Sequence, residues 1–322
     1  MIRVYKETGD KLSCEPLKKI DEDTNIEERT WIDISNPSQS MLEILANKTG
    51  IPLHFLLSSL DEEETARIDN EDDSILIVLD VPCIDTAEKD LYTTKPLIIA
   101  YNELYYVTIS KYNKTLVNGV LKKVKAIEPQ KHVRLTLNLI YQLSKEFISY
   151  LTKIDDHTKD IEARLHSTMK NKELFELMDL NKTLVYFATA LNANKAVLSK
   201  LLKSSVYKKF EADFDLMEDT EVELDQAIEM CSIYRSILAG MMDAFGSIIS
   251  NNLNIVMKTL TIITIVISIP TLIASFYGMN FSNIPLANNQ YGFYIISAIA
   301  FVIAIIGAVI LYFITKNNRN RH

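Results

Sequence analysis

Two long apolar stretches near the C-terminal end of the chain set its predicted architecture. They are Met257–Phe276 and Tyr291–Ile314, and no Asp, Glu, Lys or Arg occurs from Thr259 to Thr315. Each stretch has at least about the 20 residues that an α-helix needs to cross the hydrocarbon layer of a membrane. The pattern predicts a helical hairpin in a membrane, attached to a large water-soluble part on its N-terminal side.

Short runs rich in β-branched and aromatic residues occupy the first part of the chain, and several alternate with polar residues. Such runs, separated by polar or acidic turns, are typical of β-strands. The runs are Ile2–Tyr5, Trp31–Ile34, Ile75–Val81, Pro96–Tyr101 and Leu104–Ser110. Between them, Ser40–Leu57 has a helical pattern. We predict an α/β domain with a small sheet over residues 1–132.

From Val133 onward the apolar residues recur at helical spacing, which predicts a cytosolic helical hairpin over residues 133–218. Thr220 and Glu223 form a capping-box pattern at the start of a third helix. Nothing forces that helix to stop before Phe276, because Pro270 kinks a membrane helix without ending it. We therefore predict a stalk helix over residues 219–276, roughly 85 Å long, whose last part, about 257–276, is the first span.

The first span carries a polar seam on one face. Its members are spaced alternately three and four residues apart, as a left-handed bundle requires of the face it turns to its axis. They are Asn254, Met257, Thr261, Thr264, Ser268, Thr271 and Ser275. One interpretation is that the hydroxyls only bond back to their own helix backbone. The other, which we favour for so many in register, is a water-containing pore enclosed by several copies of the chain.

The flanks of the spans predict their orientation. Lys258 precedes the first span and three basic residues of the tail 315–322 follow the second, whereas the link 277–290 carries no charge. Positive charge collects on the cytoplasmic side, so both termini are expected to be cytoplasmic. In the second span, 291–314, small residues form a face for close packing against a neighbouring helix. They are Ala300, Ala304 and Ala308.

The charge of the soluble part narrows the classes of partner. Of the net charge of −8, the tail supplies +3, which leaves −11 on residues 1–258. A general nucleic-acid or anionic-lipid binder needs a basic surface and is excluded. The acidic balance either serves solubility or attracts divalent cations. No phosphate-binding glycine loop occurs, and the 5 histidines show no ligand spacing, so we do not expect an enzyme.

The end of the first span carries a sequence that resembles a known signature. Tyr277-Gly278-Met279-Asn280 is similar to the signature of the CorA-type magnesium channels. The resemblance extends to Asn254–Thr261, Gly240–Asp243 and Trp31–Pro37, so it covers essentially the whole chain. It implies an α+β/α membrane protein: an N-terminal cytosolic α/β domain, a long stalk helix and two C-terminal transmembrane helices, assembled as a funnel-shaped homopentamer.

The signature has a chemistry that suits Mg²⁺. This ion dehydrates reluctantly and usually keeps several waters. A ring of Asn280 amide oxygens and Gly278 carbonyls would hydrogen-bond those waters, and Met279 would shape the turn. Neutral groups also release the ion, as conduction requires. By resemblance, Asn254 forms a second polar ring at the cytoplasmic mouth, and Met257 with Leu260 forms an apolar constriction.

The resemblance also implies closure by cytosolic Mg²⁺ held between neighbouring subunits. Asp219 matches the carboxylate expected from the long helix. On the α/β side the matching positions are Leu57-Ser58, which carry no acid. The acidic residues that could substitute or contribute are Asp61, Glu62, Glu63, Glu64, Asp155 and Asp156. For each of these carboxylates a plain solvated surface position is the alternative.

The sequence thus predicts a homopentameric channel of the cell (inner or plasma) membrane that passes Mg²⁺ into the cell. Co²⁺ and Ni²⁺ are further candidate ions. A zinc or other divalent-cation transporter on the same scaffold is an alternative, but no Cys or His lies near the pore face, and zinc favours those ligands. The other alternative is a membrane-anchored cytosolic sensor without transport, which would not need the polar seam.

Overall fold

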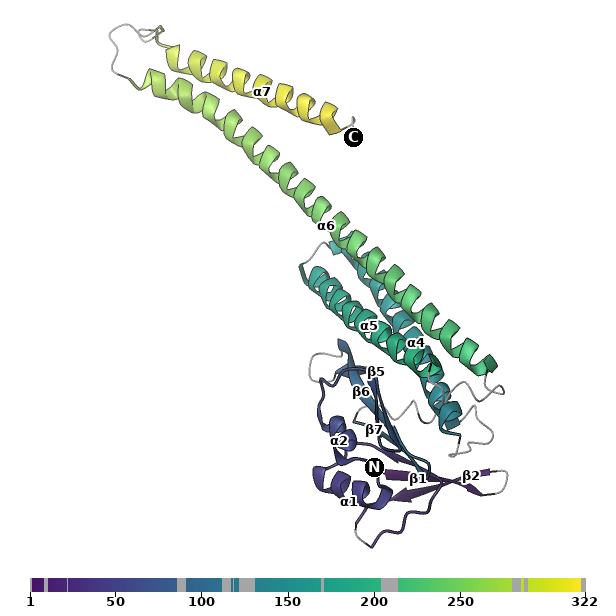
Figure 1. Ribbon diagram of the computed structural model, residues 1–322. Coiled ribbons are helices and arrows are strands. Elements are labelled where there is room, and N and C mark those ends of the chain that lie inside the picture. The colour runs from purple at the N-terminus through teal and green to yellow at the C-terminus, as the bar shows by residue number, and fades with distance from the viewer. Residues whose placement is uncertain are drawn as a thin grey trace. The chain divides into compact units, whose positions relative to one another are not determined.

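The computed structural model describes most of the chain (Figure 1). The described residues are 2–8, 11–21, 23–85, 91–111, 117, 119–121, 131–168, 171–203, 214–279, 285–286 and 289–319. They divide into two compact units, Met1–Met242 and Asp243–His322. Each unit is described by itself.

A seven-stranded sheet forms the centre of the first unit. Its order is β2-β1-β3-β7-β6-β5-β4. All neighbours are antiparallel except β3 and β7, which are parallel. The strands are β1 Ile2–Thr8, β2 Lys11–Leu17, β3 Thr30–Ile34, β4 Arg67–Glu71, β5 Ser74–Asp85, β6 Leu91–Tyr101 and β7 Tyr105–Ser110. The five predicted strands are confirmed.

Two edge strands were not predicted, β2 and β4. Their sequences, KLSCEPL and RIDNE, lack an apolar run. Each pairs with a strand that does have one: β2 pairs with β1, and β4 with β5. A polar strand at a sheet edge is held mainly by hydrogen bonds to its partner strand and buries few side chains. Its sequence therefore shows little alternation of apolar and polar residues.

One face of the sheet is covered by α1, Gln39–Thr49, and α2, Leu53–Leu57, followed by the 3₁₀ turn η1, Ser58–Leu60. Buried aliphatic side chains of these helices and of β3, β5, β6 and β7 make a common core. The helical pattern over Ser40–Leu57 is confirmed, but it forms two helices with a break between them. Gly50 ends α1 in the left-handed region at φ 72°, where glycine is favoured, and Pro52 precedes α2.

The other face of the sheet is covered by the hairpin of α4, His132–Thr168, and α5, Asn171–Lys203 (Figure 1). The buried amide of Asn194 fixes α5 to the sheet. Its Oδ1 accepts from the backbone N–H of Asp80 at 2.9 Å, and its Nδ2 donates to the Asp80 carbonyl at 2.8 Å. Phe147 and Phe187 pack edge to face between the two helices.

The third long helix, α6, runs from Phe214 to Tyr277. Within the first unit, Cys231 donates from Sγ to the carbonyl of Leu184 in α5 at 3.4 Å. Thr220 lies inside this helix, and its hydroxyl donates to the carbonyl of Leu216 at 2.6 Å. The capping-box interpretation is therefore wrong, because a helix-capping hydroxyl accepts from backbone N–H groups at the first turn.

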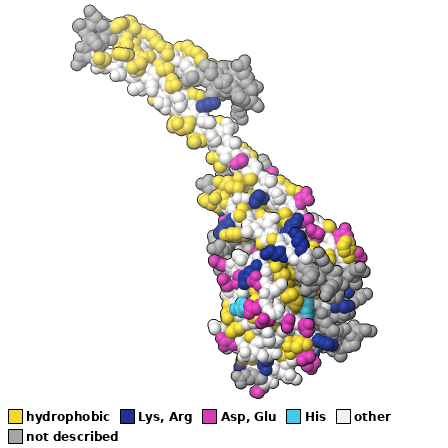
Figure 2. All heavy atoms as spheres, in the orientation of Figure 1, with side chains coloured by type: hydrophobic (Ala, Val, Ile, Leu, Met, Phe, Trp, Pro, Cys, Tyr) yellow, Lys and Arg dark blue, Asp and Glu magenta, His cyan; other side chains and the backbone are white. Residues whose placement is uncertain are grey.

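The second unit contains the rest of α6 and α7, Gly292–Arg319. Among the described residues these are the two helices long and apolar enough to cross a membrane. Apolar side chains dominate the surface of this part, whereas Asp, Glu, Lys and Arg gather on the first unit (Figure 2). The small face of α7 packs on α6: Ala300 and Ala304 are buried, and Gly307 lies beside Ile269.

Candidate functional site

The polar seam lies on a free face of α6. All of its members are exposed in the single chain. The half-buried residues of the same stretch lie on nearly the opposite side, and they are Ile262, Val266, Ile269, Pro270 and Ile273. Because α7 covers that opposite side, the polar seam is left uncovered. This is the arrangement that an inward face of an assembly requires.

The hydroxyls of the polar seam donate to their own helix. Thr261, Thr264, Ser268 and Thr271 each bond the carbonyl four residues earlier, at 2.7–2.9 Å. Thr259, which lies off the seam, does the same at 2.8 Å. Hydrogen bonding alone therefore does not distinguish the seam from the rest of the span. A hydroxyl whose proton is so engaged presents its lone pairs outward as an acceptor.

The same register continues toward the N-terminus of α6. Ser250, Ser247 and Asp243 precede Asn254 at successive spacings of four, three and four residues. All three side chains are exposed. None of the three was predicted as part of the polar seam, because they precede the apolar span. The continued three-four spacing was the signal that could have found them.

The signature begins where α6 ends. The N–H of Gly278 donates to the carbonyls of Ala274 and Ser275 at 2.9 and 3.2 Å, and the N–H of Met279 donates to Phe276 at 3.3 Å. Met279 is 46% exposed in the single chain. Asn280, the central candidate of the filter, lies outside the described residues. Gly278 and Met279 thus close the helix immediately before it.

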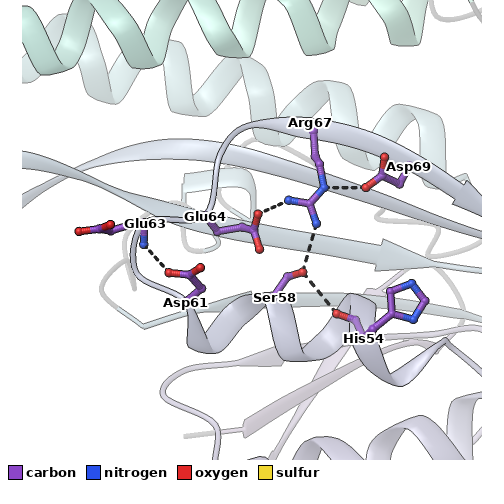
Figure 3. Close-up of polar contacts among 7 residues, drawn as sticks. All are labelled: His54, Ser58, Asp61, Glu63, Glu64, Arg67 and Asp69. Carbon is purple, nitrogen blue, oxygen red and sulfur yellow. Dashed lines mark hydrogen bonds and ion pairs between the residues drawn. The ribbon is translucent and has the colours of Figure 1, made fainter.

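Within the acidic run after η1, Glu64 is already engaged (Figure 3). Its carboxylate pairs with Arg67. The same guanidinium donates from Nε to Asp69 at 2.6 Å and from Nη2 to the hydroxyl of Ser58 at 3.3 Å. Sequence reasoning missed Arg67. The guanidinium of Arg67 already neutralises the negative charge of the Glu64 carboxylate, which a bound cation would otherwise have to neutralise.

Glu62 is neutralised as well. One carboxylate oxygen lies 2.8 Å from Nζ of Lys95, and the other pairs with Lys111. Asp61 accepts the backbone N–H of Glu63 at 2.9 Å, which makes it a turn-forming side chain. Within the acidic run, both Glu62 and Glu64 therefore have lysine or arginine partners inside their own chain.

The regulatory candidates on the long helices, Asp155 and Asp156 on α4 and Asp219 on α6, differ in their partners. Asp155 on α4 lies 2.5 Å from Nζ of Lys159, and Asp156 lies 4.0 Å from it. Asp219 on α6 is exposed, and no hydrogen bond or ion pair of its side chain is found among the described residues. Asp219 is consequently open to a ligand from outside its own chain, as is the exposed carboxylate of Glu63.

The structure does not unite these carboxylates into a metal site. Across the described ranges, no group of three or more His, Cys, Asp or Glu side chains is placed to hold a metal ion. A divalent cation needs about six oxygen ligands. A single chain therefore provides no complete regulatory centre within the described residues.

The chain combines an α/β unit with two apolar helices of bilayer length, and the first of these is the end of one long helix with a polar face. This combination is that of a two-span membrane transport protein. The chain belongs to the family of the CorA-like Mg²⁺ transporter proteins, whose model matches residues 27–318. This family consists of transporters, not enzymes. The predicted family is confirmed, and so is the predicted fold of the single chain, with its N-terminal α/β domain, long helix and two C-terminal apolar helices.

Individual relatives match nearly as broadly. The cobalt/magnesium transport protein CorA of Methanocaldococcus jannaschii is 31% identical over 86% of this chain and 87% of its own. The protein of the same name from Thermotoga maritima is 25% identical, over 89% and 82% of the two chains. The complete structure of the CorA magnesium transporter from M. jannaschii superposes with a TM-score of 0.81, at 28% identity, covering 96% of each chain.

Proposed function

We propose that this chain forms a homo-oligomeric membrane channel, pentameric by its resemblance to CorA proteins, that passes Mg²⁺ into the cell. Residues 219–276 act as the stalk that runs into the first span, and both termini are cytoplasmic. The observation that supports conduction most is the polar seam, left uncovered by α7 on the opposite side of α6.

The seam suits a hydrated cation. Waters bound to Mg²⁺ direct their protons outward, so the channel wall must accept hydrogen bonds. Hydroxyls that donate to their own helix, as Thr264 and Ser268 do, leave lone pairs for those protons. Rings of such acceptors would carry the ion with its water shell to the amide ring that we assign to Asn280.

Selectivity follows from the ligand types. The described pore face offers amide, hydroxyl and backbone oxygen and no Cys or His. These are ligands of hard cations, which favours Mg²⁺ over Zn²⁺. Two curated relatives are described as cobalt/magnesium transport proteins, which makes Co²⁺, with Ni²⁺, the competing cargo to measure.

The regulatory part of the proposal is closure by cytosolic Mg²⁺ held between subunits. Asp219 is its principal ligand here because it has no partner among the described residues. Asp155 and Asp156 are secondary candidates, since Lys159 competes with a metal for them. The run Asp61–Glu64 ranks last, because Glu62 and Glu64 are already paired.

Flux into proteoliposomes of the purified full chain tests the proposal, with Mg²⁺, Co²⁺, Ni²⁺ and Zn²⁺ offered separately. Thr264→Val removes a seam hydroxyl in every copy, and Thr259→Val removes an equally back-bonded hydroxyl off the seam. We expect at least about a tenfold loss of Mg²⁺ flux from Thr264→Val alone, since each lost hydrogen bond is worth about 1 kcal/mol. No flux of any cation by the wild type would favour the anchored-sensor alternative, and Zn²⁺ flux exceeding Mg²⁺ flux would favour the zinc alternative.

A further inference from the structure

Two adjacent residues of the inter-span link, Pro285 and Leu286, contact the ends of the two helices of the second unit. Tyr277, the last residue of α6, donates from its hydroxyl to the carbonyl oxygen of Pro285 at 3.2 Å. The carbonyl oxygen of Leu286 lies so close to Gly292, the first residue of α7, that a Cβ on Gly292 would be 2.2 Å away from it. Gly292 is accordingly buried.

The second contact leaves no room for a side chain. Leu286 has a positive φ of 67°, a conformation that non-glycine residues adopt only when their surroundings hold them there. Its carbonyl also accepts the N–H of Asn289 at 3.1 Å, and Gly292 donates to the carbonyl of Asn289 at 2.9 Å. These bonds fix the carbonyl of Leu286 in place, so only glycine fits opposite it.

We propose that Tyr277 and Gly292 are positioning residues, which hold Pro285, Leu286 and Asn289 against the ends of α6 and α7, beside Gly278 and Met279 of the signature. The bond from Tyr277 joins the end of α6 to Pro285, a residue eight positions later in the chain. The consequence for ion selection rests on the proposed function. Groups that recognise an ion's water shell need such support, because they act only within a narrow range of positions.

Two pairs of variants in the full-length assembly test this role. Tyr277→Phe removes only the hydroxyl, and its control is Tyr291→Phe, an exposed tyrosine at the other end of the link whose hydroxyl has no bond among the described residues. Gly292→Ala adds one carbon against a backbone oxygen. Its control is Gly307→Ala, whose new carbon would lie at an ordinary 3.6 Å from Ile269 Cδ1.

The first readout does not depend on transport: amide hydrogen exchange of Asn289 and Gly292 in the purified protein. Tyr277→Phe should speed exchange about 2- to 10-fold, the usual range for one lost hydrogen bond. Gly292→Ala should speed it at least as much. The double variant should fall short of the product of the two, as expected for residues that act on one geometry. If Tyr277→Phe and Gly292→Ala exchange no faster than their controls, the proposal is overturned. If Gly292→Ala fails to assemble, the comparison of Tyr277→Phe with Tyr291→Phe still decides the question.

The second readout separates positioning from mere structure. In proteoliposomes with equal amounts of assembled protein, Tyr277→Phe should change the ratio of Mg²⁺ to Ca²⁺ flux and raise the Mg²⁺ concentration for half-maximal flux. Faster exchange with both quantities unchanged would overturn the positioning role. A wild-type protein that moves no cation would refute the proposed function instead, and the exchange measurement would still decide whether the two contacts hold the link.

Discussion

A buried carboxyl at the centre of the sheet should make the first unit less stable as the pH rises. Asp33 on β3 is 9% exposed, and its Oδ1 accepts from the hydroxyl of Thr108 on β7 at 2.9 Å. That hydroxyl in turn accepts from Nε1 of Trp31 at 2.9 Å. Burial raises the pKa of Asp33 from 3.8 to about 6, although the Thr108 hydrogen bond and the charge of Arg3 oppose the rise.

The sign of the effect follows from the direction of this pKa change. The folded state holds the proton of Asp33 more tightly than the unfolded state does. Below pH 3.8 the carboxyl is mostly protonated in both states, so it does not lower the free energy of unfolding. Stability then falls as the pH rises from 3.8 to about 6 and stays lower above it. The difference corresponds to about 3 kcal/mol at 1.36 kcal/mol per pKa unit. Asp33→Asn mimics the protonated form and can still accept from Thr108.

The chain contains one tryptophan, Trp31, which is fully buried and belongs to this network. Its fluorescence during denaturant unfolding of the full protein therefore reports on this unit specifically. Asp33→Asn should be more stable than wild type by up to about 3 kcal/mol at pH 8 and equal to it near pH 4. The control Asp72→Asn, in an exposed turn, should follow the wild type. Equal stability of Asp33→Asn and wild type at every pH would refute the reasoning.

Three further predictions concern transport. Asn280→Ala should abolish Mg²⁺ uptake and leave the oligomer intact by size-exclusion chromatography; uptake at the wild-type rate would mean that the signature is structural. Cysteines at Thr264, Ser268 or Thr271 should react with small water-soluble thiol reagents much faster than cysteines at Ile265 or Leu272, and equal labelling would argue against a wet pore. Asp219→Asn should shift inhibition by internal Mg²⁺ to higher concentration and reduce protection from proteolysis by Mg²⁺. Glu64→Gln serves as its comparison, because Arg67 already pairs with Glu64, and an effect of Glu64→Gln alone would reverse our ranking of the regulatory carboxylates.

The pattern of apolar residues predicted the central strands and the long helices because both are local periodicities. The five buried strands each carry a run of β-branched and aromatic residues, and the sheet confirms them. The pattern failed where an element is polar or is interrupted. Strand β4 has no apolar run and depends on its ladder with β5. The helical pattern over Ser40–Leu57 continued through Gly50, whose positive φ ends α1.

In the candidate site, too, the sequence predicted the local features and missed those that depend on residues far apart in the chain. The spacing of the polar seam is a property of one helix, so the sequence predicted that its members share a face, and all are exposed in the single chain. The ion partners of the acidic run come from distant segments: Lys95 and Lys111 reach Glu62 from β6 and from the end of β7. No spacing rule connects residues so far apart, so the run appeared as a free carboxylate cluster.

The sequence by itself determined that two apolar helices can cross a membrane, that the soluble part is acidic, and that polar side chains follow one face of the first span. These properties depend on composition and on the 3.6-residue period of a helix. Only the tertiary structure decided that α7 covers the side opposite the polar seam, that Arg67 forms an ion pair with Glu64, and that the carbonyl of Leu286 excludes any side chain at Gly292. The packing of α7 on α6 joins separate segments, which only the fold brings together. The contacts of Arg67 with Glu64 and of Leu286 with Gly292 join residues three and six positions apart, and they depend on backbone conformations that residue spacing does not specify.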